Sequence, residues 1–230
     1  MYLTALCLDA PARFFVQVEE LMNILYEDDE IIVVFKEAGL AVQSGSALQM
    51  DLESMLMRRL ARGDGRRPEL YVVHRIDQPV EGLVLFAKTK EAAADLTRQL
   101  TDGRMKKIYK ARVEGQVPKE EDTLEDYLVR DAGNVTRIVP KPKNPSKGRN
   151  APKKAVLHYR KVGDSELLIE LFTGRHHQIR VQLANAGMPI VGDRKYGKTD
   201  PAYRGRLMLT AWQLTFIHPK TKKMVTLTAE

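Results

Sequence analysis

The chain has 230 residues, 43% of them hydrophobic, so it is long enough to bury one substantial core. Its 37 Lys and Arg against 30 Asp and Glu give a net charge of +7, which favours a polyanionic partner but also suits an ordinary soluble basic protein. The single cysteine excludes an internal disulfide and a cysteine-based zinc site and fits a cytoplasmic setting. No apolar run approaches the roughly 18–20 residues that span a bilayer, so we expect no membrane segment.

The N-terminal part of the chain predicts an extension followed by a pair of strands. Residues 1–21 lack the basic start of a signal peptide and the Arg- and Ser-rich character of a transit peptide. One domain is the default for a chain of this length. The family resemblance described below begins at residue 22, so it implies an N-terminal extension of unknown role at residues 1–21 and a single catalytic domain over residues 22–230. Within it, the apolar runs 24–26 and 31–36 flank an acidic turn and are typical of adjacent strands.

Two amphipathic segments predict helices. Residues 51–61 carry four apolar side chains on one stripe, and residues 90–100 follow Thr89, a natural N-cap. After the second helix, residues 107–113 alternate like a half-buried strand, whereas residues 116–139 have only a weak pattern.

Between these two helices, the apolar runs 71–73 and 83–87 flank a short polar loop. Both runs are rich in Val, Leu, Phe and Tyr and indicate buried strands. A loop anchored at both ends in the core holds Asp77 still, close to the guanidinium of Arg75. Such an arrangement suggests either a structural ion pair or a nucleophile that a cation keeps ionised.

Residues 140–154 form a basic segment with six Lys and Arg, no acidic residue and four prolines. We expect a loop here, because proline interrupts both helices and strands. A run of like charge is usually a solvated segment, and a phosphate-contacting arm is the alternative.

The C-terminal part predicts a strand pair at 156–161 and 167–172, a helix that opens within 173–180 and runs to Ala186, and closing strands at 207–216 and 224–227. Strands and helices are mixed, and hairpins dominate. The sequence therefore predicts an α+β domain with a mainly antiparallel sheet.

Several spaced motifs resemble those of the RluA-type RNA pseudouridine synthases. The polar loop reads His-Arg-Ile-Asp at 74–77 and continues as Gly-Leu followed by an apolar run and Ala-Lys at 82–88. A Lys-x-Tyr-x-Ala motif follows at 107–111, and Gly-Arg-x-His-Gln-Ile-Arg at 174–180. The family commonly has Thr-Ser before the glycine, whereas this chain has Val80-Glu81, which adds a negative charge near Asp77.

The resemblance implies a mixed sheet with helices and loops around a central catalytic cleft, in a form without an S4 domain. It also implies an isomerase that converts uridines of ribosomal or transfer RNA to pseudouridine and needs no cofactor or metal. Asp77 would be the essential carboxylate, Arg180 its cation, and Tyr109 the residue that stacks on the target base. Attack at C1′, attack at C6 of uracil and assistance to a glycal remain open as the role of Asp77.

RNA binding is expected from the cleft and from the basic loops. Arg75 is expected to hold the site vacated by the extruded base or its phosphate, and His74 to order the loop. The other candidate RNA-binding residues are Arg175, Lys141, Lys143 and Lys147.

Two other functions compete with the synthase. The first is a non-catalytic RNA-binding protein on the same scaffold, which the Val80-Glu81 departure keeps open. The second is a metal-dependent hydrolase, suggested by the possible metal ligands His74, His176, His177 and Asp193. It is disfavoured because consecutive helical histidines would point to different faces. We expect a monomer, with RNA as its partner and no metal.

Overall fold

The computed structural model of this protein describes residues 22–45, 49–61, 68–143, 148, 151–197 and 203–229. The extension expected at residues 1–21 and the candidate Lys147 lie outside these described residues. The helices are α2 (Leu52–Leu60), α3 (Lys90–Asp102) and α4 (Gln178–Asn185). The strands are β1 (Asn23–Glu27), β2 (Ile31–Lys36), β3 (Tyr71–Val72), β4 (Glu81–Ala87), β5 (Lys106–Arg112), β6 (Glu121–Arg130), β7 (Thr136–Val139), β8 (Lys153–Gly163), β9 (Glu166–Leu171), β10 (Leu209–Ile217) and β11 (Met224–Thr228).

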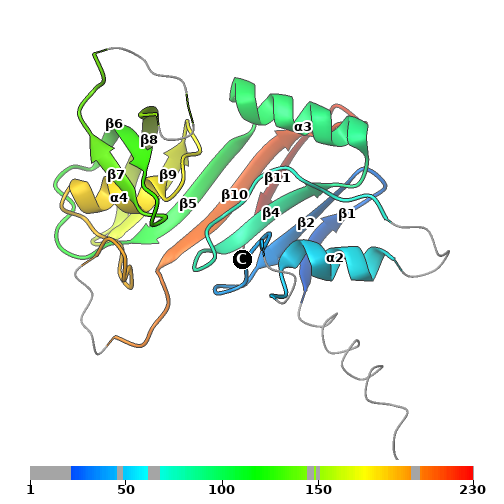
Figure 1. The fold of residues 1–230 in the computed structure, drawn as a ribbon, viewed down its shortest axis with the longest axis horizontal. Coiled ribbons are helices and arrows are strands. Elements are labelled where there is room, and N and C mark those ends of the chain that lie inside the picture. Colours follow the sequence, from blue (N-terminus) through cyan, green and yellow to red (C-terminus); the bar gives the residue numbers. More distant parts are fainter. Residues whose placement is uncertain are drawn as a thin grey trace, which may run out of the picture.

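All these strands join one long, twisted sheet (Figure 1) in the order β1-β2-β4-β10-β5-β9-β8-β6-β7, with β11 paired to β10 and β3 to β4. Every pairing is antiparallel except that of β10 with β4. The predicted α+β class with a mainly antiparallel sheet is thus confirmed. No helix among the described residues is long and apolar enough to cross a membrane.

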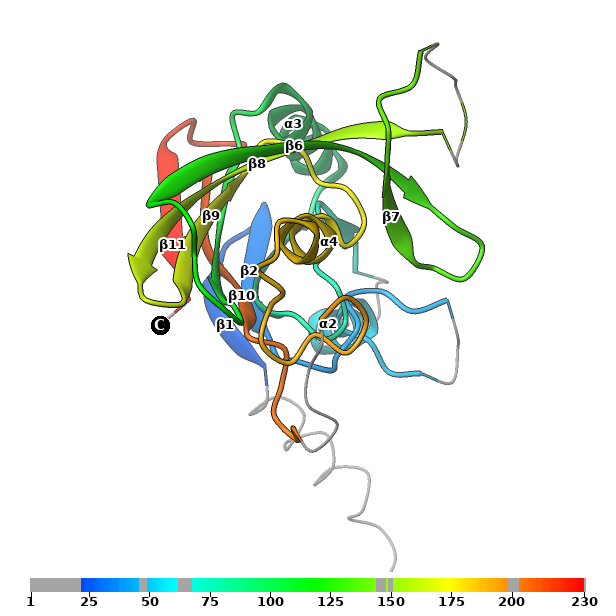
Figure 2. The same cartoon turned by 90° about the vertical axis from the view of Figure 1, so that its left-hand side faces the viewer.

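The helices cover both faces of the sheet. α2 and α4 contribute Leu56 and Leu183 to the larger core cluster, whereas α3 contributes Leu96 to a separate cluster on the other face. In Figure 2 the β6–β9 half of the sheet curves around α4. The curvature brings the start of α4 over the centre of the sheet, where β4 and β5 carry the loop and strand of the predicted site.

β4 is buried along its whole length, as its apolar composition predicts. Its second residue, Gly82, has a φ of +119°, and a Cβ there would lie 2.3 Å from the carbonyl oxygen of Ala211 on β10. Only glycine therefore permits the close parallel approach of these two strands. This contact with Ala211 explains why the residue at position 82, just after the polar loop, is a glycine.

The structure corrects three sequence-based boundaries. Residues 116–139, which have little pattern, contain β6 and β7, whose half-exposed residues dilute the alternation. The basic loop ends before residue 153, because β8 begins there. The last helix starts only at Gln178, since His177 adopts a left-handed conformation with a φ of 51° that no helix accommodates.

Candidate active site

The loop between β3 and β4 and the segment before α4 face each other across a cleft of about 730 Å³. Asp77 from the loop, Tyr109 from β5 and Arg180 from α4 line this cleft together. Ligand pockets in proteins span roughly 300–1,000 Å³, so the cleft has room for a nucleotide. The three residues predicted from separate motifs are therefore neighbours in space.

Buried polar side chains hold the Asp77 loop from both ends. At one end, His74 accepts a hydrogen bond through Nε2 from the backbone N–H of Leu85, at 3.3 Å. At the other end, the fully buried Lys36 donates to the carbonyl oxygens of Gln78, Glu37 and Leu40, at 3.1, 2.9 and 2.7 Å. Burial lowers the pKa of Lys36 to about 8, against the opposing charges of Asp77 and Glu81.

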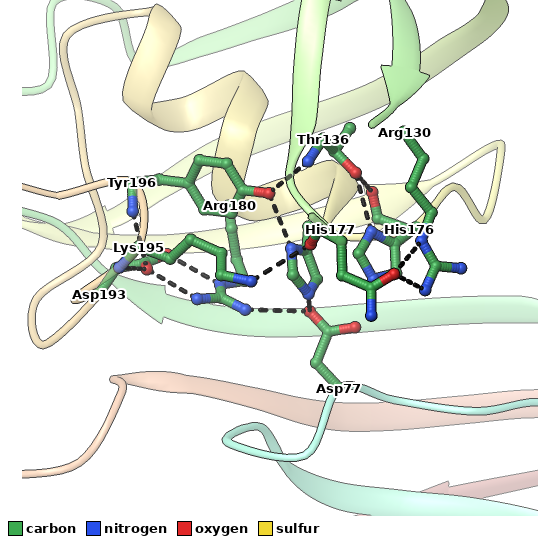
Figure 3. Close-up of polar contacts among 10 residues, drawn as sticks. Asp77, Arg130, Thr136, His176, His177, Arg180, Asp193, Lys195 and Tyr196 are labelled. Carbon is green, nitrogen blue, oxygen red and sulfur yellow. Dashed lines mark hydrogen bonds and ion pairs between the residues drawn. The ribbon is translucent and has the colours of Figure 1, made fainter. Parts of the chain in front are cut away.

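Arg180 lies between two carboxylates (Figure 3). It donates through Nε and Nη2 to the two oxygens of Asp193, at 2.8 and 2.7 Å, and through Nη1 to Oδ2 of Asp77 at 3.4 Å. The planar guanidinium is thus fixed by the bidentate pair with Asp193 and presents its remaining edge to Asp77.

The net result for Asp77 is a raised pKa. Burial is the main cause, and the charge and hydrogen bond of Arg180 oppose it only in part. The sequence-based expectation was that an adjacent guanidinium would cancel the effect of burial; the structure corrects it, because Arg180 makes its shorter bonds to Asp193. A carboxylate with a raised pKa is a stronger base and nucleophile once it is ionised.

A second side chain also points at Asp77. His177 places Nε2 3.7 Å from Oδ2 of Asp77, while its Nδ1 lies 2.7 Å from the hydroxyl of Tyr196. That hydroxyl accepts a hydrogen bond from the backbone N–H of Thr136, and we assign its own proton to the bond with Nδ1 of His177. The proton of the imidazole then sits on Nε2, facing Asp77, and the pKa of His177 is lowered to about 3, chiefly by burial.

The two consecutive histidines are arranged differently from the prediction. Because residues 173–177 precede the helix, His176 and His177 do not point to different helix faces; their rings stack with centroids 3.7 Å apart. Nδ1 of His176 contacts the hydroxyl of Thr136 at 2.8 Å. No group of three or more potential metal ligands forms among the described residues.

Tyr109 is buried in the core cluster and also lines the cleft. The burial raises its pKa, and the charge of Asp77 raises it further. Its hydroxyl therefore stays protonated, and it makes no hydrogen bond to any described residue. Packing fixes the ring, and the free hydroxyl remains available to a bound base.

Glu81 stands where the family commonly has Ser, and nearby side chains balance its negative charge. Its carboxylate is buried, but it accepts hydrogen bonds from the guanidinium of Arg206 and, at 3.0 Å, from the hydroxyl of Thr210. Arg206 belongs to the segment before β10, far from Glu81 in the sequence. The extra charge beside the catalytic loop is therefore balanced by a cation that sequence reasoning did not identify.

The candidate RNA-binding residues divide into three groups. Arg75 is exposed, lines the cleft and has no partner among the described residues, and Arg175 lines its rim. His74 lies behind the loop, where only 8% of it is exposed, which suits an ordering role. Lys141 and Lys143 are exposed at the start of the basic loop.

Sequence reasoning missed two cations near Asp77. Arg130 at the end of β6 lines the same cleft, and Lys195 in the loop after α4 lines an adjoining pocket that Asp77 also lines. The segment around β6 has little pattern, so Arg130 gave no signal. The loop reads Gly-Asp-Arg-Lys-Tyr-Gly, and its Asp193 and Tyr196 are the groups that orient Arg180 and His177. The Gly-Asp-Arg-Lys-Tyr-Gly sequence of this loop was the signal that could have found them.

Comparison with known proteins agrees with this geometry. A sequence profile described as RNA pseudouridylate synthase matches residues 30–185, more than half of the chain.

This chain belongs to the RNA pseudouridylate synthase family.

Members of the family are isomerases that convert uridine to pseudouridine in RNA. The chain is 35% identical over 217 residues to ribosomal large subunit pseudouridine synthase C of Buchnera aphidicola, covering 90% of this chain and 66% of that protein. It is 34% identical over 202 residues to the dual-specificity RNA pseudouridine synthase RluA of Vibrio vulnificus, covering 86% and 79%. The chain thus spans about two thirds to four fifths of the length of these two relatives.

The fold is also shared with a solved structure. Human RNA pseudouridylate synthase domain containing 1 superposes with a TM-score of 0.73 at 24% identity, over 92% of this chain and 84% of that one. This likeness confirms the predicted fold.

Proposed function

We propose that this protein is an RNA pseudouridine synthase in which Asp77 is the essential carboxylate. The observation that carries the proposal is the position of Asp77, held by its loop in a cleft with the guanidinium of Arg180 on one side and Tyr109 in the same wall. Family membership supplies the reaction, and the placement of these three groups in one cleft supports their roles.

The reaction breaks the N1–C1′ bond of a uridine, turns the uracil and joins it to C1′ through C5, which loses its proton to solvent. Attack of Asp77 at C1′, attack at C6 and removal of a sugar proton all require an ionised carboxylate. Arg180 favours that form, and His177 adds an N–H directed at the same oxygen. Tyr109 holds the detached base by stacking and offers its hydroxyl to the proton transfers at C5.

The proposed substrate is ribosomal or transfer RNA, as the names of the relatives suggest for those proteins. The cleft is lined by Arg75, Arg130 and Arg175, and Lys195 lines the adjoining pocket, a density of cations that suits a folded polyanion. Arg75, exposed beside Asp77, is placed to hold a phosphate or the space left by the extruded nucleotide. We further propose a monomeric, cytoplasmic enzyme.

The alternative of a non-catalytic RNA-binding protein rests on Glu81, and the ion pair of that residue with Arg206 weakens it. An unpaired carboxylate beside Asp77 would have opposed ionisation of the nucleophile. With its charge balanced, the departure from Thr-Ser leaves the site able to react.

The test is release of tritium from ribosomal and transfer RNA transcripts labelled at C5 of uridine. The wild-type protein should release tritium, and Asp77→Asn should release none while it still binds the RNA. Asp164→Asn, which removes an exposed carboxylate in the turn between β8 and β9, serves as the control and should be fully active. Full turnover by Asp77→Asn would remove Asp77 as the essential carboxylate.

A further inference from the structure

Lys107 on β5 has no counterion among the described residues. Its side chain is partly buried in the cleft wall, yet no described residue accepts a hydrogen bond from its ammonium or forms an ion pair with it. Its neighbour Lys106 is exposed and pairs with Glu170 at 3.7 Å. Desolvating an ammonium without a partner is unfavourable for the folded protein, so this arrangement calls for an explanation.

The strand places Lys107 beside the base-binding residue. Side chains alternate along a strand, so Lys107 and Tyr109 lie on the same face of β5, about 7 Å apart along the chain. Both line the cleft that contains Asp77. An anion held at Lys107 would therefore lie next to the position proposed for the target base.

The surroundings of the ammonium leave it open. Gly174 faces it so closely that a Cβ at that position would lie 3.4 Å from Nζ of Lys107. A side chain larger than hydrogen at residue 174 would cover the charge. The glycine of the motif thus leaves the ammonium accessible from the cleft.

A second donor in the same wall is also unsatisfied. Because Nε2 of His74 accepts from Leu85, the proton of this imidazole lies on Nδ1, and that buried atom has no hydrogen-bond partner among the described residues. The pKa of His74 is lowered to about 3 by burial and by the charge of Lys107, so the two groups lie within electrostatic reach of each other. Two donors in this part of the cleft wall, Lys107 Nζ and His74 Nδ1, thus have no acceptor among the described residues.

We propose that Lys107 forms an anion subsite that holds a backbone phosphate of the RNA next to the nucleotide that reacts. The inference rests on the proposed function and deepens it, because it assigns the RNA backbone a fixed contact two residues from Tyr109. Phosphate is the anion that an RNA brings into this cleft with every nucleotide, and an ammonium binds it as a point charge. A bound phosphate would pair with the ammonium of Lys107, which has no ion-pair partner among the described residues of the free protein.

The test compares Lys107→Met, Lys107→Arg and the control Lys110→Met, each in the Asp77→Asn background so that bound RNA is not converted. Lys110 lies on the same strand but on the opposite face, with its ammonium 4.1 Å from the centroid of the Trp212 ring. Binding of fluorescently labelled transfer RNA and ribosomal RNA fragments is measured by anisotropy at several salt concentrations. Lys107→Met should weaken binding about tenfold and reduce the slope of log K against log salt by about 0.7–0.9.

Lys107→Arg keeps the charge and should retain most of the salt slope, and Lys110→Met should leave the slope unchanged. A salt slope unaffected by Lys107→Met would overturn the subsite.

A thermal melt separates this role from a structural one. Removing an unpaired, desolvated cation should leave the melting temperature of the free protein equal or higher, whereas removal of a structural lysine would lower it. A clear fall in melting temperature for Lys107→Met therefore also counts against the subsite. If the Lys107-dependent salt slope is found but the wild-type protein releases no tritium, the proposed reaction fails and the subsite stands. If Lys107→Met leaves RNA binding unchanged, and the same substitution in the protein with Asp77 intact still releases tritium, the reaction stands and the subsite fails.

Discussion

Arg180 makes its two shortest hydrogen bonds to Asp193 and a longer one to Asp77. The bidentate pair lowers the pKa of Asp193 despite its burial, whereas the pKa of Asp77 is raised. The two carboxylates that contact Arg180 therefore have pKa values shifted in opposite directions. Asp193 is the counterion that orients the arginine, and Asp77 keeps the basicity that the proposed reaction requires.

Asp193→Asn should unfold the site rather than merely slow the reaction. Asp193 is 1% exposed and Arg180 is 6% exposed, so the substitution leaves a buried guanidinium without its main partner. We expect the free energy of unfolding to fall by about 3–5 kcal/mol, together with loss of tritium release. Denaturant unfolding measures the first effect, and the exposed variant Asp164→Asn should show neither. A stable, active Asp193→Asn would mean that Asp77 alone holds Arg180.

Asp77 should titrate above the ordinary range of an aspartate. A carboxyl-carbon NMR titration should give a pKa above about 3.9, and Arg180→Met should raise it further, because the largest influence that favours the ionised form is lost. A midpoint at or below the ordinary value would contradict the burial argument.

The same shift has a consequence for stability. A carboxyl whose pKa is raised in the folded state is most favourable to folding below its unfolded pKa, and that contribution is lost as the pH rises through the folded pKa. Asp77→Asn has no titrating carboxyl at this position, so its stability does not decrease with pH for this reason. The unfolding free energy of Asp77→Asn minus that of the wild type should therefore be larger at pH 7 than at pH 3. Denaturant unfolding at both pH values measures this difference. A difference that does not change with pH would argue against a raised pKa.

Tyr196→Phe should lower turnover without weakening RNA binding. The substitution removes the hydroxyl that accepts from Thr136 and fixes the tautomer of His177, so the Nε2 proton no longer faces Asp77 reliably. We expect kcat to fall by up to about 100-fold, as for a small misplacement of a reacting group, with KM unchanged. Tyr71→Phe, which removes an exposed hydroxyl bonded to Glu69, is the matched control. Equal activity of both variants would exclude the tautomer from the mechanism.

Arg206→Met should destabilise the protein by about 1–3 kcal/mol, because it leaves the buried carboxylate of Glu81 without its cation. The double variant Glu81→Ser with Arg206→Met should recover most of that loss, since both charges are then absent. Thermal or denaturant unfolding of the single and double variants completes the cycle. Additive losses would show that the pair is not coupled.

The amino-acid sequence by itself determined the class of fold and the three central residues. Alternating and continuous apolar runs fix strands locally, so β2, β4, β5 and β10 were predictable. The apolar stripe of residues 51–61 marked α2, and the N-cap Thr89 marked α3. Asp77, Tyr109 and Arg180 were identified because each lies in a short motif. Such motifs are local patterns, and a local pattern is what a sequence displays directly.

Only the tertiary structure decided which groups these residues meet. The partners of Arg180, Glu81 and His177 come from segments separated along the chain by 13, 125 and 19 residues. Lys107 is unpaired because, in the part of the chain that the structure describes, no acceptor of the folded cleft wall reaches its ammonium. Burial and pairing are properties of the packed chain, because desolvation and charge act through space, and they set whether a given Asp, His or Lys acts as base, donor or anion site.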